Sequence, residues 1–284
     1  MAIDSEFLLR MRSGDMASVQ SEIWGLATQW LEAGCIDQAN RLLSALLETG
    51  RIPPFFLDCF EVPWALTGTR PARAPAPRAG IEDIELGMWE LFAFKNSADG
   101  FVDRIMNANI EKLSDLDLVA RAMLMAYDGD RPGHVAAPER VAEASGALER
   151  FFDSGSRFRT WEAWTARVLF ALRQGDVERA KKYLVDMTRE GQPVIVLLSD
   201  RTVAEIVLSG LLAPVLNVTP QQCEEDLRRI EQAIAERLKN GRTPPYADLT
   251  WRQLVSEIRD WEGRRVTRAA ARATAIAEAE QRRA

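Results

Sequence analysis

The feature that most constrains the fold is a pair of amphipathic helices predicted between Trp161 and Pro193. Apolar residues recur at intervals of three or four on both sides of a short turn, Gln174-Gly175-Asp176, which gives each helix one apolar face. These residues are Trp161, Trp164, Val168 and Ala171 before the turn, and Val177, Ala180, Leu184 and Met187 after it. An apolar face must be buried to be stable. We therefore expect the two helices to pack on each other and on neighbouring helices.

The same spacing continues along most of the chain. It predicts helices at 4–12, 16–33, 37–49, 81–95, 101–113, 115–127, 141–155, 201–212, 220–240 and from 249 onwards, with a short one at 55–60. The Val/Ile-rich run 194–198 has a strand-like composition, but no second run is available to pair with it, so we expect a short buried helix or turn. The predicted fold class is all-α, with about 11–12 helices, no significant sheet, and stacked antiparallel hairpins in an irregular solenoid or bundle.

Several helix ends carry local signals. Thr219-Pro220 and Ser114-Asp115 are typical of helix starts, because the first residue of each pair accepts hydrogen bonds from free backbone N–H groups. Gly34 follows a predicted helix, where a glycine is a common terminator.

The pair at 161–193 resembles a tetratricopeptide repeat. Trp164, Gly175, Ala180 and Leu184 stand at the spacings of that family, in which the small alanine allows the two helices to approach closely. Residues 23–53 resemble it more weakly, through Gly34, Ala39 and Leu43. The family's leucine-glycine pair is replaced by Arg167-Val168, and its closing proline is one residue late at Pro193. The resemblance implies stacked helical hairpins; any helical hairpin bundle would produce part of it.

The composition indicates where the chain divides. Residues 67–80 contain three arginines and three prolines without a large apolar side chain, which predicts a linker or exposed loop. We expect N-terminal hairpins at 1–66, a main helical domain at 81–262 that packs with them, and a charged C-terminal helix or tail at 263–284.

The charge distribution disfavours nucleic acid as a partner. The chain has a formal charge of −6, and the arginines of the linker and of the last 26 residues hide a more acidic body. An acidic surface repels a phosphate backbone but suits a basic protein. Simple solubility is the plainer interpretation of the same charge.

Cysteine usage and hydropathy bear on location. Cys35, Cys59 and Cys223 are far apart and have no metal-ligand spacing, which favours a reducing compartment. The N-terminal residues do not have the pattern of a signal peptide, and no apolar run is long enough to span a bilayer. We expect a cytoplasmic protein without membrane contact.

Catalytic and cofactor motifs are missing from the sequence, including phosphate-binding loops and the patterns of metalloproteases and serine hydrolases. The single histidine, His134, lies in a predicted polar loop with no converging ligands around it. Asp128 and Asp130 begin like a calcium loop, but no glutamate closes it. We therefore predict no catalytic residue, cofactor or metal.

Our first hypothesis is a non-enzymatic protein-binding module, namely an immunity-type inhibitor of a bacterial toxin, a chaperone or an adaptor. The candidate partner-binding residues are acidic groups at predicted helix starts and loops, and one tryptophan beside the linker: Glu82, Asp83, Glu85, Asp128, Asp130 and Trp64. The alternative is a helical enzyme or small-ligand protein with a carboxylate/arginine site that forms no motif. A third option is self-assembly through the Arg-rich C-terminal helix.

Overall fold

The computed structural model describes residues 3, 5–13, 16–49, 54–71, 107–127, 138–155 and 159–239. Over these residues the chain forms eleven α-helices, two 3-10 helices and no strand, which confirms the predicted all-α class. The elements are α1 (Ser5–Ser13), α2 (Met16–Glu32), α3 (Ile36–Thr49), α4 (Pro54–Thr67), η1 (Ile110–Lys112), α7 (Asp115–Tyr127), α8 (Pro138–Asp153), α9 (Trp161–Arg173), α10 (Val177–Arg189), η3 (Ile195–Ser199), α11 (Arg201–Leu208), α12 (Ala213–Leu216) and α13 (Pro220–Lys239).

The hairpin α9–α10 forms where the apolar spacing predicts it. Gly175 adopts a φ of 73°, which a glycine reaches without strain, and the Asp176 carboxylate accepts a hydrogen bond from the backbone N–H of Arg179. Most residues of the two predicted faces are buried: Trp164, Val168, Ala171, Ala180, Leu184 and Met187. The prediction was wrong for Val177, which is the first residue of α10 and is 37% exposed.

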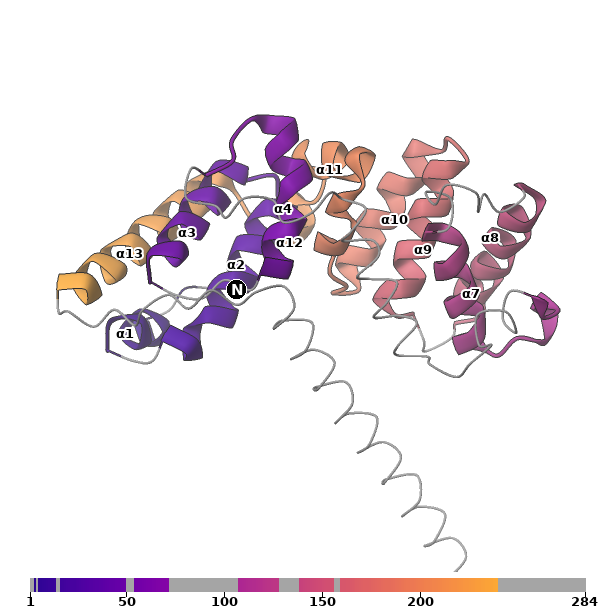
Figure 1. Ribbon diagram of the computed structural model, residues 1–284, viewed down its shortest axis with the longest axis horizontal. Coiled ribbons are helices and arrows are strands. Elements are labelled where there is room, and N and C mark those ends of the chain that lie inside the picture. Colours follow the sequence, from indigo (N-terminus) through magenta and orange to yellow (C-terminus); the bar gives the residue numbers. More distant parts are fainter. Residues whose placement is uncertain are drawn as a thin grey trace, which may run out of the picture.

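One end of the molecule is a stack of two helix pairs. Helix α7 packs against both α8 and α9, and α9 packs against α10 (Figure 1). Trp164 and Phe152 meet edge to face at this junction, with ring centroids 4.6 Å apart. The pair α7–α8 therefore covers α9–α10 on one side.

The N-terminal hairpin α2–α3 packs on a later part of the chain. A Cβ atom added to Gly34, in the α2–α3 turn, would lie only 3.2 Å from the backbone of Gly210, in the turn between α11 and α12. Helix α4 packs on η3 and α11, and α11 lies between α4 and α10 (Figure 1). Two turns that are far apart in sequence thus meet through glycine backbones.

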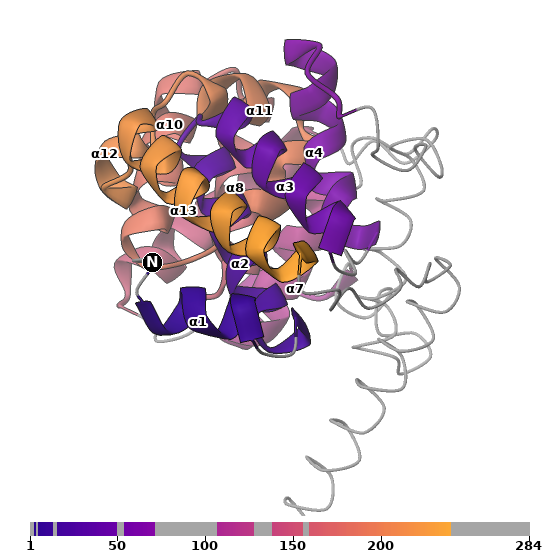
Figure 2. The same cartoon turned by 90° about the vertical axis from the view of Figure 1, so that its left-hand side faces the viewer.

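The last described helix returns to the first ones. Helix α13 packs against α1 and α3, and Figure 2 shows it lying beside them. Its apolar stripe, Cys223, Leu227, Ile230 and Ile234, is buried in this contact as predicted. The main helical segment and the N-terminal hairpins therefore share one hydrophobic core. The boundaries expected at residues 80 and 262 lie outside the described residues.

Local signals predicted helix starts better than helix ends. The side-chain oxygens of Ser114 and Thr219 accept hydrogen bonds from the backbone N–H groups of Asp117 and Gln222, as expected of N-caps. Residues 194–198, for which a short buried helix or turn was expected, lie largely in the 3-10 helix η3. Three predictions were wrong. The short helix expected at 55–60 is part of α4, which continues to Thr67. The helix from Arg201 ends at Leu208 rather than at residue 212, because Gly210 adopts a φ of 83°. The helix expected to reach Leu113 is interrupted at Asn109, which has an extended backbone and caps η1.

Candidate functional site

Five of the six predicted partner-binding residues lie outside the described residues. They are Glu82, Asp83, Glu85, Asp128 and Asp130, and His134 lies outside them as well. A role for these side chains in binding stays a prediction.

Trp64, the sixth candidate, is buried. Its side chain is 2% exposed, and its ring lies 5.6 Å from that of Phe60, centroid to centroid. The indole N–H donates a hydrogen bond of 2.6 Å to the amide oxygen of Asn40 on α3. A buried tryptophan whose N–H has a hydrogen-bond acceptor is typical of a core residue.

Asn40 connects this buried cluster to the start of the Pro/Arg-rich segment. Its amide nitrogen donates to both the carbonyl oxygen and the hydroxyl of Thr69, at 3.1 and 3.0 Å. Arg70 pairs with Glu61 at 2.7 Å and lies over the Trp64 ring. The first residues of the predicted linker are therefore bound to α3 and α4.

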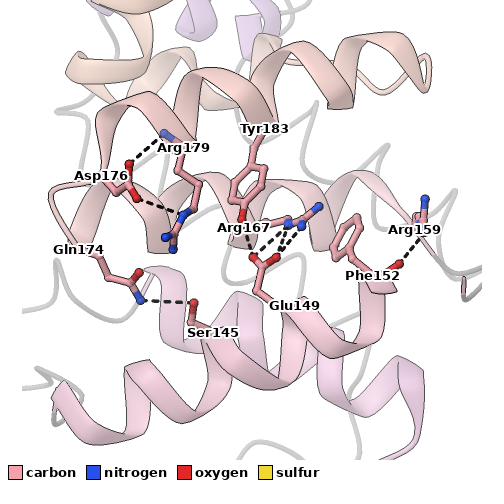
Figure 3. A network of polar contacts seen from close by, with 9 residues as sticks. All are labelled: Ser145, Glu149, Phe152, Arg159, Arg167, Gln174, Asp176, Arg179 and Tyr183. Atoms are coloured by element: carbon pink, nitrogen blue, oxygen red, sulfur yellow. Dashed lines mark hydrogen bonds and ion pairs between the residues drawn. The ribbon is translucent and has the colours of Figure 1, made fainter. Parts of the chain in front are cut away.

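The most connected polar cluster joins α8, α9 and α10. Figure 3 shows Glu149 of α8 pointing toward Arg167 of α9 and Tyr183 of α10. The Arg167 Nε atom donates to both carboxylate oxygens of Glu149, at 3.0 and 3.1 Å, and the Tyr183 hydroxyl donates to the same carboxylate at 2.9 Å. One carboxylate therefore holds three helices.

Aromatic rings surround the Arg167 guanidinium. Its central carbon lies 4.2 Å from the centroid of the Phe152 ring, 4.0 Å from that of Tyr183 and 5.3 Å from that of Trp164. A flat, weakly hydrated guanidinium packs well on ring faces, which a lysine ammonium does less effectively. The ion pair is thus shielded from water on the Arg167 side, where the side chain is 14% exposed.

The electrostatics of this cluster keep its ionisation states fixed at neutral pH. Burial opposes the charged form of Glu149, but hydrogen bonds from Arg167 and Tyr183 outweigh it and lower the Glu149 pKa. Burial and the adjacent carboxylate together raise the pKa of Tyr183 above its usual value. A general acid or base works best with a pKa near the working pH. The pKa of Glu149 is lowered and that of Tyr183 is raised, so both move further from pH 7, as expected for groups with a structural role.

The cluster extends through neighbouring side chains on both sides. Glu190 accepts from the indole N–H of Trp164 and from Arg159, both at 3.1 Å. Gln174, in the turn, donates to Ser145 of α8 at 3.3 Å (Figure 3). The bonds of Glu190 therefore join the end of α10 to the start of α9, and the bond of Gln174 joins the α9–α10 turn to α8.

A second charged junction connects α3 to α13. One terminal nitrogen of Arg41 donates to both oxygens of Glu224 at 2.9 Å, and the other donates to both oxygens of Glu231 at 3.0 Å. The Arg41 side chain is 46% exposed, so water screens these pairs.

Glu32 is a third inter-helix carboxylate and the most buried of them. Oxygen Oε1 accepts the backbone N–H groups of Val194 and Ile195, at 2.9 and 2.7 Å, and so binds the start of η3 to the end of α2. Burial raises the Glu32 pKa to about 7, although the two hydrogen bonds act in the opposite direction. Its protonation therefore changes near neutral pH.

Sequence analysis did not predict these three junctions. In the sequence, Arg167 is a departure from the tetratricopeptide pattern, and no motif contains Glu149 or Glu32. One signal was present: Arg167 lies three residues after Trp164, on the side of the helix that the apolar spacing marks as buried. A charge at such a position needs a partner.

Two further findings concern the part of the chain that the structure describes. Within it, no three His, Cys, Asp or Glu side chains come together as metal ligands. None of its helices has the length and apolar character needed to cross a membrane.

No protein-family model, curated protein or solved structure matches the chain, so the tetratricopeptide resemblance stays a prediction.

Proposed function

We propose that this chain is a non-catalytic protein-binding module that presents a rigid, multi-helix surface to a basic partner protein. The observation that carries the proposal is that charged side chains between the helices bond one helix to another. Glu149 joins three consecutive helices, whereas Glu32 joins segments that are 162 positions apart in the sequence. Arg41 joins α3 to α13 at the surface. Their bonds set the relative positions of the helices and leave a surface that needs little ordering on binding.

The acidic body favours a basic partner. With a net charge of −6, the chain attracts a positively charged protein at long range and speeds its association. An immunity-type inhibitor of a toxin, a chaperone and an adaptor all belong to this class. A reducing, cytoplasmic setting suits the three free thiols.

The experiment is affinity capture with the tagged full-length chain as bait in an extract of the source cells. We expect one basic protein to be retained at low salt and largely released at high salt, because screening weakens long-range attraction. The matched control bait is an unrelated helical protein of the same size and net charge. Recovery of the same proteins by both baits would contradict the proposal.

The same material tests the alternative of a small-ligand protein or enzyme. Among the described residues, the cluster of Glu149, Arg167 and Tyr183 favours it, since a carboxylate and a largely buried arginine converge there. A metabolite that raises the melting temperature of wild-type chain, but not of an Arg167→Met variant, would support the alternative and displace the binding module.

A further inference from the structure

Two buried cysteines, Cys35 and Cys223, come from distant parts of the sequence and lie in the same region of the core. Cys35 immediately precedes α3, and Cys223 lies in the first turn of α13. Both side chains are buried, with exposed fractions of 4% and 0%, and both are free thiols. The two thiol groups lie close enough to affect each other's pKa, although they are 188 positions apart in the sequence.

The packing of α3 on α13 independently brings these two positions together. Arg41 of α3 bonds to Glu224 and Glu231, so α3 lies along the first turns of α13. Glu224 is the residue next to Cys223, and Arg41 lies less than two turns beyond Cys35. The starts of the two helices are therefore side by side.

From this juxtaposition we propose that Cys35 and Cys223 form an intramolecular disulfide under oxidative stress and thereby join α13 covalently to the N-terminal hairpin. The oxidant is a small azo or disulfide compound. Both S–H bonds break and one S–S bond forms, while two electrons and two protons pass to the oxidant; an azo N=N bond is reduced to a hydrazine. The third cysteine, Cys59 on α4, takes no part.

The environment of the pair makes the step slow but specific. Burial raises the pKa of both thiols, so little of the reactive thiolate is present while α13 is docked. Attack on the oxidant therefore requires a brief opening of the helix, after which the neighbouring thiol resolves the mixed intermediate. Cys59 lies on α4 and is partly exposed, so we expect it to form mixed adducts with the oxidant.

The bond is expected to stabilise the folded chain. It closes a loop of 188 positions, and long loops lose the most chain entropy in the unfolded state when they are closed. We expect the melting temperature of the oxidised chain to rise by on the order of 10 °C, fully reversed by dithiothreitol.

The test treats the native full-length chain with the azo oxidant diamide and maps its peptides without reduction. We expect the product to stay monomeric and to yield a linked peptide that contains Cys35 and Cys223 and is lighter by about 2 Da than the two reduced peptides together. Cys59 should appear in a separate peptide that is not linked to another cysteine. Cys59→Ser is the matched control and should crosslink at the wild-type rate. Cys35→Ser and Cys223→Ala should give no intramolecular crosslink.

Three outcomes would overturn the inference. They are a disulfide that includes Cys59, a crosslinked dimer as the main product, and an intact Cys35–Cys223 dithiol after an exposure that crosslinks the urea-unfolded chain. An oxidised chain that melts no higher than the reduced one would show that the bond does not hold α13 in place. The inference does not depend on the proposed function.

Discussion

The interface of α8 with α9 and the interface of α3 with α13 are both joined by an arginine that bonds to glutamate, yet their surroundings differ. Arg167 is 14% exposed and lies between aromatic rings, whereas Arg41 is 46% exposed and has no ring contact among the described residues. Water screens an exposed pair and reduces its net value to a fraction of a kcal/mol. We therefore expect the same two residue types to make a strong junction between α8 and α9 and a weak one between α3 and α13.

Arg167→Ala should have the largest effect of the substitutions considered. It leaves the Glu149 carboxylate partly buried without its main partner and removes a guanidinium packed on Phe152 and Tyr183. We expect the free energy of unfolding to fall by about 3 kcal/mol, measured by urea denaturation at pH 7. The control is Arg167→Ala combined with Glu149→Ala, which removes both charges and should recover part of the loss. A loss below about 1 kcal/mol would place this junction in the same class as the exposed one.

Glu32→Gln extends the comparison to a carboxylate that is almost fully buried. The folded-state pKa is raised to about 7 from 4.5, so the folded protein holds this proton more tightly than the unfolded chain does. The stabilisation from that proton is complete below pH 4.5 and is lost as the pH rises through 7. The amide stays neutral and can still accept from Val194 and Ile195, so the variant should not lose it.

The expected gain of Glu32→Gln over wild type at pH 8 is about 3 kcal/mol, the value of the shift in free energy. At pH 4 the two proteins should unfold at the same urea concentration. Glu32→Ala is the contrasting variant, because it removes the acceptor and should be less stable at both pH values. An equal difference between wild type and Glu32→Gln at pH 4 and pH 8 would disprove the raised pKa.

Arg167→Lys and Arg41→Lys keep the positive charge at each junction but remove the flat, multi-donor shape of the guanidinium. Arg167→Lys keeps the positive charge but loses the paired donors and the flat contact with the rings, and we expect a loss of about 1–2 kcal/mol. Arg41→Lys should cost no more than about 0.3 kcal/mol, because water replaces the lost bonds. Thermal unfolding of both variants beside wild type measures the difference, and equal losses would mean that the aromatic surround of Arg167 contributes nothing.

The fold was more predictable from sequence than these junctions, for a physical reason. Helix starts such as Thr219-Pro220 depend on residues within one turn, and hydrophobic periodicity acts within one helix. The early end of α11 was missed because an isolated Gly210 inside an apolar run does not reveal its left-handed φ. Glu149 and Arg167 lie 18 positions apart, Glu32 and Val194 lie 162 apart, and their pairing depends on how helices pack. The burial of Trp64 was not predicted either, because its position beside a polar segment gave no indication of the Asn40 acceptor.

Arg41→Ala should have the smallest effect and the clearest dependence on salt. Both of its glutamate partners are partly exposed and remain hydrated after the arginine is removed, so no buried charge is left behind. The expected loss is about 0.5 kcal/mol at low ionic strength, falling toward zero in 1 M salt, where the screening length is about 3 Å. The loss in Arg167→Ala should change much less with salt, because the rings and neighbouring helices keep ions away from that pair. Urea unfolding of both variants at two salt concentrations gives this contrast directly. A salt-independent loss of several kcal/mol for Arg41→Ala would contradict this expectation. It would mean that the orientation of the two Arg41–glutamate pairs, and not their exposure to water, sets the strength of the α3–α13 junction.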